Sequence, residues 1–247
     1  MSSDRAIDNE FIELKIIKDS IWLMTFKFKT WTLESVTATS KALNFLESQT
    51  GELGLITTCS NPSIYSAGID FTQFGKSLTY STTFLMHFQR LLAQFMRLSF
   101  PSIAAINGHC FAGGIMIAMA QDFRIQRDDH GHICLSEINI GMPIPWGMLF
   151  HIQDKVSHQT IRKLALFGHK FTPQESLESS LVDKLVPKDK LIDECVAFLE
   201  PMVEKSHSRG AFAQIRDAIH KRGIEASLEK FLPPLSLMPD PEAKQKL

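Results

Sequence analysis

Hydrophobic residues recur along this chain with two different periods. Short apolar runs, some with alternating polar positions, predict strands at 11–17, 21–26, 53–58, 101–106, 122–127 and 132–135. Helical spacing of apolar residues predicts helices at 33–46, 78–98 and 113–120, and helical patterns dominate from Gly147 onward. Strands interleaved with helices indicate an α/β fold with crossover connections between strands.

Length and composition restrict the class of protein. A chain of 247 residues can form one sizeable core, and its 44% hydrophobic and 21% charged residues are typical of a soluble globular protein. The formal net charge of −1 gives no electrostatic argument for binding nucleic acid or an anionic membrane. No apolar run approaches the ~20 residues that a membrane-spanning helix needs.

Cysteines and histidines give no pattern for a metal site. Cys59, Cys110, Cys134 and Cys195 are widely spaced and form no CxxC pair, which favours reduced thiols over disulfides or a zinc site. His130 and His132 flank a glycine, but no acid or cysteine set completes a metal site, so a solvated turn is the favoured interpretation.

Targeting signals are weak. Acidic residues within the first ten positions disfavour a mitochondrial presequence, and no apolar stretch indicates a secretory signal. The last residues, Gln245-Lys246-Leu247, are similar to a peroxisomal tripeptide except that Gln replaces a small residue. We therefore expect a peroxisomal location, with cytoplasm and mitochondrial matrix as alternatives, and an ordinary charged tail as the other interpretation of the tripeptide.

One acidic residue, Glu137, stands out because two glycine-bearing turns precede it. The turns are Ser66-Ala67-Gly68-Ile69-Asp70 and Ala112-Gly113-Gly114. Small residues let a ligand approach the backbone, and two fixed N–H groups can stabilise charge that develops on one oxygen. A carboxylate beside them can move a proton. The combination predicts chemistry through an enolate, although each turn alone is also typical of an ordinary strand-to-helix connection.

These segments, in this order, resemble the crotonase (enoyl-CoA hydratase/isomerase) superfamily. The resemblance is carried by the two turns, by Pro101-Ser102-Ile103-Ala104-Ala105-Ile106-Asn107-Gly108-His109, and by Ser136-Glu137-Ile138-Asn139-Ile140-Gly141. It is specific over about residues 53–190, and the chain departs from the family pattern around 28–33. It implies a core of repeated ββα units over 1–190, with 191–247 as a helical region of the same domain. A homotrimer or hexamer is also implied.

The resemblance further implies an acyl-CoA thioester as ligand, with no metal and no cofactor apart from the CoA of the substrate. By position, Ile69 and Gly113 match the residues whose N–H groups form the family's oxyanion hole. Other residues of the same motifs are expected to contact the substrate or shape its site: Ser66, Ala67, Gly68, Asp70, Gly114, Met116, Pro145 and Trp146. For Asp70 and Asp122 the resemblance also suggests structural hydrogen bonding.

Within this family the number of carboxylates distinguishes the reactions. Met116 occupies the position of the first Glu of hydratases, and Pro145 that of the Asp of dienoyl-CoA isomerases. Glu137 alone remains, which resembles the Δ3-Δ2-enoyl-CoA isomerases, as does Pro145-Trp146. We therefore expect isomerisation of 3-enoyl-CoA to trans-2-enoyl-CoA. A hydratase or thioesterase reaction that uses Glu137 on water stays open, as does a catalytically silent assembly subunit.

Overall fold

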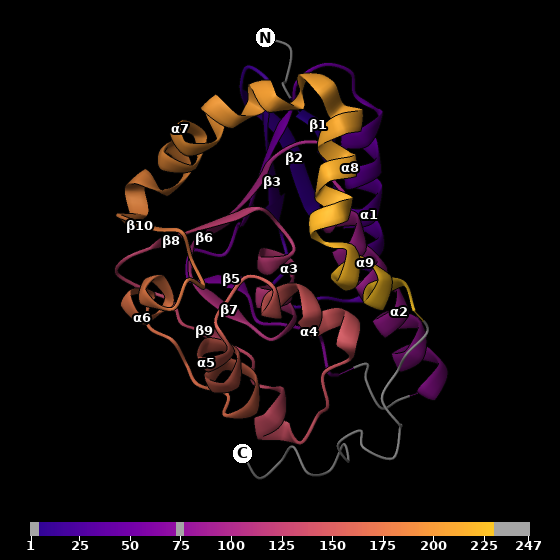
Figure 1. Ribbon diagram of the computed structural model, residues 1–247, viewed down its shortest axis with the longest axis vertical. Coiled ribbons are helices and arrows are strands. Elements are labelled where there is room, and N and C mark those ends of the chain that lie inside the picture. Colours follow the sequence, from indigo (N-terminus) through magenta and orange to yellow (C-terminus); the bar gives the residue numbers. More distant parts are fainter. Residues whose placement is uncertain (1–4, 73–76, 230–247) are drawn as a thin grey trace.

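A seven-stranded mixed sheet forms the centre of the protein in our computed structural model, which describes residues 5–72 and 77–229 (Figure 1). The spatial order of its strands is β1 (Arg5–Asp8), β2 (Ile12–Lys18), β3 (Ile21–Phe26), β4 (Gly54–Cys59), β6 (Ser102–Ile106), β8 (Phe123–Arg127) and β10 (Lys184–Val186). The first three pair antiparallel, and the pairs from β3 to β10 are parallel. Neighbours in space are thus in chain order.

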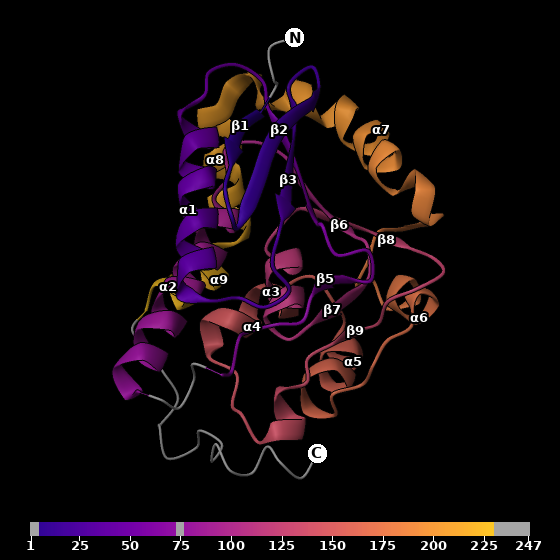
Figure 2. The ribbon, with the colours of Figure 1, turned by 180° about the vertical axis from the view of Figure 1, so that it is seen from behind.

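Both faces of this sheet are covered, because alternate residues of each strand point to opposite sides. Ile21 and Leu23 of β3 pack with α7 (Leu191–Val203), which buries side chains at helical spacing down to Leu199 and Val203. Trp22 and Met24 join the larger cluster on the other face. That cluster is formed with α1 (Leu33–Ser48), α2 (Leu78–Met96) and α3 (Gly113–Met119). Figures 1 and 2 show α7 and α1 on opposite sides of the sheet.

A second, three-stranded sheet lies beside the first. Its strands β5 (Ile64–Ser66), β7 (His109–Phe111) and β9 (Ile133–Cys134) all run parallel, in the order β5-β7-β9. Each is too short to show a period-2 pattern, which is why the sequence predicts only the segment around β9. The remaining short elements follow it along the chain: η1 (Glu137–Ile140), α4 (Trp146–Gln153), α5 (His158–Ile161), the π-helix η2 (Arg162–Leu166), α6 (Pro173–Glu178) and η3 (Lys188–Lys190).

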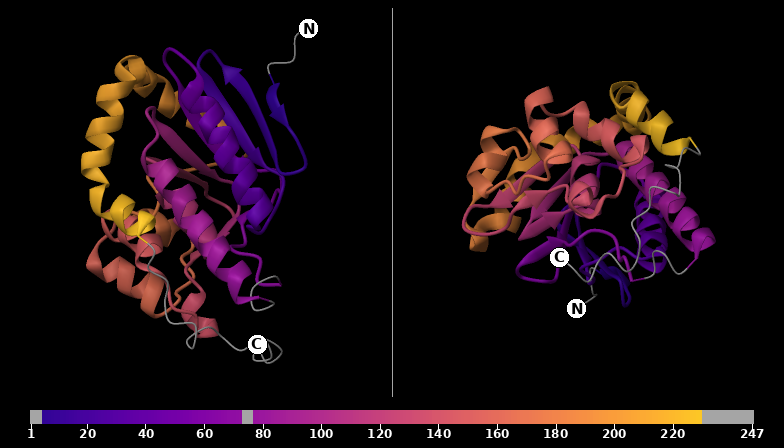
Figure 3. Two further views of the ribbon diagram at one scale, coloured as in Figure 1. Left: turned by 90° about the vertical axis from the view of Figure 1, so that its right-hand side faces the viewer. Right: turned by 90° about the horizontal axis from the view of Figure 1, so that it is seen from below.

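The chain then returns across the core through η4 (Glu204–Ser208), α8 (Arg209–Ile219) and α9 (Lys221–Leu228). Helix α9 packs on α2 and α4, and Figure 3 shows α8 and α9 in yellow beside α1 and α2. Helix α8 is unusual because Arg216 is its only buried residue. Its attachment to the core therefore depends on polar contacts rather than on an apolar stripe.

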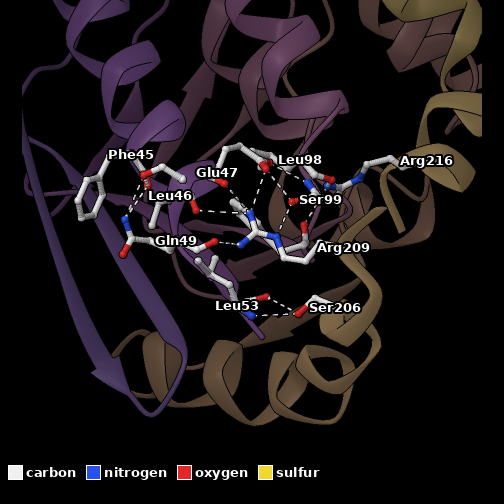
Figure 4. Close-up of polar contacts among 12 residues, drawn as sticks. Phe45, Leu46, Glu47, Gln49, Leu53, Leu98, Ser99, Ser206, Arg209 and Arg216 are labelled. Atoms are coloured by element: carbon white, nitrogen blue, oxygen red, sulfur yellow. Dashed lines mark hydrogen bonds and ion pairs between the residues drawn. The ribbon is translucent and has the colours of Figure 1, made fainter. Parts of the chain in front are cut away.

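Two arginines make that attachment, which we call the α8 anchor (Arg209, Arg216, Glu47, Ser99 and Asp122). Arg209 donates to Ser99 Oγ (2.6 Å), to Glu47 Oε2 (3.0 Å) and to the carbonyl at the end of α1 (2.7 Å). Arg216 pairs with Asp122 and donates to two further carbonyls at 2.5 and 2.9 Å. Figure 4 shows both guanidinium groups entering the core side by side.

The predicted elements are confirmed to within two or three residues at their ends, and the α/β class with a C-terminal helical region is confirmed. Strands β1, β5, β7 and β10 are additional. All four cysteines are free and buried. In the described ranges, no helix has the length and apolar character required to cross a membrane. The C-terminal tripeptide 245–247 lies outside the described residues.

Candidate active site

Three segments of the candidate site follow the three strands of the small sheet. Strand β5 leads into the turn at Ala67-Gly68, β7 leads to Gly113, and β9 leads to Glu137. Because the strands are parallel neighbours, their carboxyl ends meet at one edge, which is where open parallel sheets place their ligands. The small sheet, rather than the large one, therefore brings the sequence-predicted residues together.

The first turn is fixed by Trp31. The Trp31 N–H donates to the Gly68 carbonyl (2.8 Å), and the Trp31 carbonyl accepts from the Asp70 N–H (2.9 Å). These two bonds form a parallel β-bridge between Trp31 and Ile69. In such a bridge the middle residue turns its own N–H away from the partner. The Ile69 N–H has no acceptor among the described residues.

Trp31 also accounts for the region where the chain departs from the family pattern. Its fully buried ring packs edge-on against Phe26, Phe28 and Phe88. An aromatic cluster thus holds the loop in this region. The sequence predicts the aromatic residues of 84–100 as core, and Phe84, Phe88, Phe95 and Phe100 are fully buried.

The two turns touch each other directly. Gly68 has φ +93°, and a Cβ there would lie 2.7 Å from the Cβ of Ala112, so glycine is required both by conformation and by space. A Cβ on Gly113 would lie 3.3 Å from Cγ1 of Ile69 and 3.0 Å from the ring of Phe88. Ile69 and Gly113 are therefore neighbours, as the prediction of a shared role requires.

Backbone strain occurs at the second turn. Ala112 has φ +50° and ψ −121°, a region that costs a non-glycine residue about 1–3 kcal/mol. It directly precedes Gly113, the first residue of α3, whose N–H also lacks an acceptor in the described part of the chain. The strained residue thus presents an unpaired N–H beside that of Ile69.

Other residues of the turns have packing roles that the structure makes visible. Ser66 is buried and its Oγ accepts the N–H of Gly68 (3.2 Å), and a Cβ on Gly114 would lie 2.6 Å from that of Ser66. Ala67 is exposed and donates its N–H to the Lys29 carbonyl (2.7 Å). Asp70 accepts from the backbone and hydroxyl of Thr72 (2.9 and 2.7 Å).

Both aspartates make hydrogen bonds that hold local structure. Asp70 closes its turn through the bonds to Thr72, and Asp122 accepts the N–H of Ser102 (2.8 Å) while it pairs with Arg216. Burial alone would raise the pKa of Asp122, but the charge and hydrogen bonds of Arg216 outweigh it and hold that pKa below its usual value. The charge of Asp122 is thus committed to the α8 anchor.

Glu137 is the buried acid at the same sheet edge. The Ala112 N–H of the second turn donates to the Cys134 carbonyl (2.8 Å). Glu137 comes three residues after Cys134 and therefore lies near this turn. Its side chain is 4% exposed, and Oε2 has no hydrogen-bond partner in the described chain. Burial raises the pKa of Glu137 to about 7. A carboxylate held in this way is a stronger base than an exposed one.

Residues at the other family positions cannot add a second acid. Met116 is buried in α3, and its carbonyl accepts a hydrogen bond from Nε2 of the fully buried His151 (2.9 Å). Pro145 is buried and precedes α4. Trp146 opens α4 with its side chain 55% exposed, so it lies at the surface rather than in the core.

Tyr65 and Gln121, which sequence reasoning missed, support the site through buried hydrogen bonds. The buried Tyr65 hydroxyl lies 2.9 Å from Thr57 Oγ1 and 3.3 Å from Gln121 Nε2. These bonds tie β5 to β4 and to the end of α3. Their only sequence signal is a polar residue within each apolar element.

The histidines around β7 form a packed group. His109 Nδ1 accepts the N–H of His132 (3.1 Å), and their rings stack with centroids 5.5 Å apart. His109 is therefore a hydrogen-bonded structural residue, located at the amino end of β7 and away from the candidate site. No set of three potential ligands suited to a metal occurs among residues 5–72 and 77–229.

Comparison with known proteins identifies relatives in one family. Residues 17–232 match the model of the enoyl-CoA hydratase/isomerase family. A human protein named enoyl-CoA delta isomerase 1, mitochondrial, is 29% identical over 162 residues, which cover 65% of this chain and 54% of that protein. The chain is also 27% identical over 183 residues to an Arabidopsis thaliana enoyl-CoA delta isomerase 2, peroxisomal, and the match covers 70% of this chain and 76% of that one.

A solved structure extends the likeness to the fold. The human mitochondrial delta3-delta2-enoyl-CoA isomerase matches with a TM-score of 0.79 and 25% identity, over 86% of this chain and 84% of that one. The family match spans the large sheet from β3 to β10, the small sheet with Glu137, and the helices up to α9. The chain belongs to the enoyl-CoA hydratase/isomerase family.

Proposed function

We propose that this protein converts 3-enoyl-CoA thioesters to trans-2-enoyl-CoA, as needed for oxidation of unsaturated fatty acids. One observation carries the proposal. The buried Glu137 has an unpartnered carboxylate oxygen and follows β9, beside two turns whose Ile69 and Gly113 N–H groups have no acceptor among the described residues.

The two N–H groups suit the carbonyl oxygen of the thioester. Removal of a proton from C2 moves negative charge onto that oxygen, and fixed donors stabilise it without reorganisation. Loss of one such donor typically raises the barrier by roughly 3–4 kcal/mol. The Ile69 and Gly113 donors are held by the Trp31 bridge and by the strained Ala112.

Glu137 then acts in both proton transfers. Its carboxylate removes the proton from C2, and the resulting carboxylic acid delivers a proton to C4 of the dienolate, so the carboxylate is regenerated. A pKa of about 7 lets one group serve as base and then as acid near neutral pH. The CoA is part of the substrate, and the proposed steps call for no further cofactor or metal.

The isomerase is favoured over a hydratase because Glu137 is the only carboxylate among the three positions 116, 137 and 145 that distinguish the reactions of the family. Hydratases of the family have a second acid at the position of Met116, and dienoyl-CoA isomerases have an Asp at the position of Pro145. Both Met116 and Pro145 are buried. Neither side chain can orient or activate a water molecule. A thioesterase reaction would need water at the same place.

The decisive experiment measures turnover of 3-hexenoyl-CoA and 3-decenoyl-CoA by the wild type and by Glu137→Gln. We expect trans-2-enoyl-CoA without hydration or free CoA, and a loss of about 10³-fold or more in the variant. Formation of 3-hydroxyacyl-CoA or free CoA would instead identify a hydratase or thioesterase. Absence of any turnover while acyl-CoA still binds would refute the isomerase and indicate a silent subunit.

We also propose that the chain forms a homotrimer, or a hexamer built from two trimers. Ile138, Leu166 and Phe167 are 48%, 60% and 73% exposed, and Gly168 packs on Ile138, so they form one apolar surface beside Glu137. Such surfaces in monomers usually mark contact sites. Analytical ultracentrifugation of the wild type and of Phe167→Asp tests this, and a monomeric wild type would refute it.

A peroxisomal location is our proposal for the site of action. It is supported by the likeness of Gln245-Lys246-Leu247 to a peroxisomal tripeptide and by the name of the Arabidopsis relative. The mitochondrial matrix and the cytoplasm are the alternatives. Imaging of a fluorescent protein fused to the amino end, with and without residues 245–247, separates them, since peroxisomal import should depend on these residues.

A further inference from the structure

Helix α3, which begins with Gly113, is held only loosely at its start by its own hydrogen bonds. No described side chain caps it, and the bond from the Met116 N–H to the carbonyl of the strained Ala112 is 3.4 Å long, compared with the usual ~2.9–3.0 Å. The Gly113 N–H has no acceptor in the described chain. Every residue of α3 is buried, so the position of its first turn depends on the elements that surround it.

Helix α4 contacts α3 through His151. Figures 1 and 2 show the two helices next to each other, and the fully buried His151 ring places Nε2 2.9 Å from the Met116 carbonyl. A carbonyl oxygen can only accept, so Nε2 carries the proton and donates. The same carbonyl already accepts the Ala120 N–H (3.1 Å), as an α-helix requires. The bond from His151 is therefore additional to those that the helix makes for itself.

A histidine is a costly choice at this position if it serves packing alone. The Nδ1 atom of His151 is buried and has no hydrogen-bond partner among the described residues. Burial lowers the pKa of His151 to about 3, so the ring is neutral near neutral pH. An apolar side chain would fill the same space without leaving a buried nitrogen unpaired. The bond to Met116 gives this polar ring a reason to be here.

The bond reaches the candidate site through the backbone of α3. Met116 lies three residues after Gly113, which is about 4.5 Å along the helix axis. A short helix in a close-packed core moves as a unit, so a shift at Met116 carries Gly113 with it. The Gly113 N–H has to meet the same oxygen as the Ile69 N–H, and such donors act at about 2.7–3.1 Å from it. A displacement of ~1 Å can lower a rate by about 10²-fold.

We propose that His151 is a positioning residue of the candidate active site. Its neutral ring holds α3, through the Met116 carbonyl, so that the Gly113 and Ile69 N–H groups face one thioester oxygen. In this role His151 acts through α3 and does not contact the substrate. Its effect on turnover rests on the proposed isomerase function, whereas its effect on the polarisation of a bound thioester carbonyl does not.

The experiment compares His151→Gln with His151→Asn, two neutral amides that differ in reach. The amide nitrogen of Gln can take the place of Nε2, and that of Asn only the place of Nδ1. Two quantities are measured: kcat and KM with 3-hexenoyl-CoA, and the absorption band of bound 2,4-hexadienoyl-CoA, which moves to longer wavelength as its thioester carbonyl is polarised. His151→Asn should lower kcat by about 10–100-fold, keep KM within about threefold, and reduce the band shift by about half or more. His151→Gln should retain kcat and the band shift to within about threefold.

Two further variants separate positioning from stability. His151→Leu removes the donor and the unpaired Nδ1 together, so kcat and the band shift should fall as in His151→Asn while the midpoint of urea unfolding stays unchanged or rises. Ser227→Ala is the matched control, because it removes another buried bond to α4, from Ser227 Oγ of α9 to the Gly147 carbonyl (2.7 Å). It should lower the unfolding midpoint and leave kcat and the band shift within about twofold of wild type.

Four results would overturn the proposal. The first is a wild-type band shift in His151→Asn or His151→Leu. The second is a His151→Gln variant as impaired as His151→Asn, which would show that the hydrogen bond is not the cause. The third is an equal loss in Ser227→Ala, which would indicate general packing of α4. The fourth is no band shift in the wild type. If the wild type shifts the band but does not isomerise 3-hexenoyl-CoA, the isomerase proposal fails and the band still tests His151, so the two failures are distinguishable.

Discussion

The candidate active site and the α8 anchor are both rich in polar groups, but the hydrogen-bonding state of those groups is opposite in the two regions. In the anchor, each charged group has partners: Arg216 with Asp122, and Arg209 with Glu47 and Ser99. In the site, Glu137 Oε2 and the N–H groups of Ile69 and Gly113 have none in the described chain. Buried polar groups are normally satisfied, so an unsatisfied set at one sheet edge indicates groups reserved for a ligand.

The comparison predicts that the same change of Glu to Gln has different consequences in the two regions. Glu137→Gln should lower turnover of 3-decenoyl-CoA by about 10³–10⁴-fold, equivalent to roughly 4–5.5 kcal/mol of barrier, because the proton shuttle is lost. Steady-state kinetics measure it. Retention of more than a tenth of the activity would mean that Glu137 is not the shuttle.

Stability of that variant should change in the opposite direction to activity. Because burial raises the folded-state pKa of Glu137 from 4.5 to about 7, its ionisation opposes folding, and the stability that the protonated group contributes is lost as pH rises from about 4.5 to about 7. Glu137→Gln should remove this loss and gain up to about 3 kcal/mol at pH 8 relative to pH 4. Urea unfolding at both pH values tests it, and equal effects at the two would contradict the assignment.

Breaking the anchor should reduce stability rather than chemistry. Arg216→Met leaves the Asp122 carboxylate without its cation and two buried carbonyls without a donor, at a cost of about 3–5 kcal/mol. Unfolding by guanidinium measures the loss. The double variant Arg216→Met/Asp122→Asn should recover part of it, and a double variant as unstable as the single one would show that the charge is not the cause.

Two glycines with positive φ, one in the candidate site and one outside it, test how far activity depends on the backbone of the site. Gly68→Ala should cost about 2–3 kcal/mol and most of the activity, since the new Cβ would lie 2.7 Å from that of Ala112. Gly51→Ala, with φ +84° and nothing within 4 Å, is the matched control and should cost only about 1 kcal/mol with full turnover. Equal effects would show that contact between the two turns is unimportant.

The smallest expected effect is that of Glu47→Gln. Its carboxylate accepts from Ser99 N–H (2.8 Å) and pairs with Arg209, but the side chain is 36% exposed, so solvent screens the pair. We expect about 1 kcal/mol of destabilisation and unchanged turnover by the assays above. A loss of activity like that of Glu137→Gln would remove the distinction between the two regions.

Much of the site could be predicted from the sequence because its residues lie in short, distinctive segments. Glu137 and both glycine turns are each contiguous, and the buried carboxylate follows from its apolar neighbours. The small sheet could not be predicted, since strands such as β7 and β9 have three and two residues and carry no periodicity. Nor could the anchor, because Arg209 and Arg216 look like ordinary surface residues of an amphipathic helix until α8 is docked.

The strictly sequential order of the large sheet has a consequence for how the protein is made. Each strand from β1 to β10 is added next to the one that precedes it in that sheet, so the sheet can extend while the chain leaves the ribosome. The last contacts cannot form so early. Arg209 reaches back 160 residues to Gln49, and Ser206 reaches back 153 residues to Leu53. The contacts that close the core between α1 and α8 can therefore form only after nearly the whole chain has been synthesised. They complete the fold after the sheet has assembled.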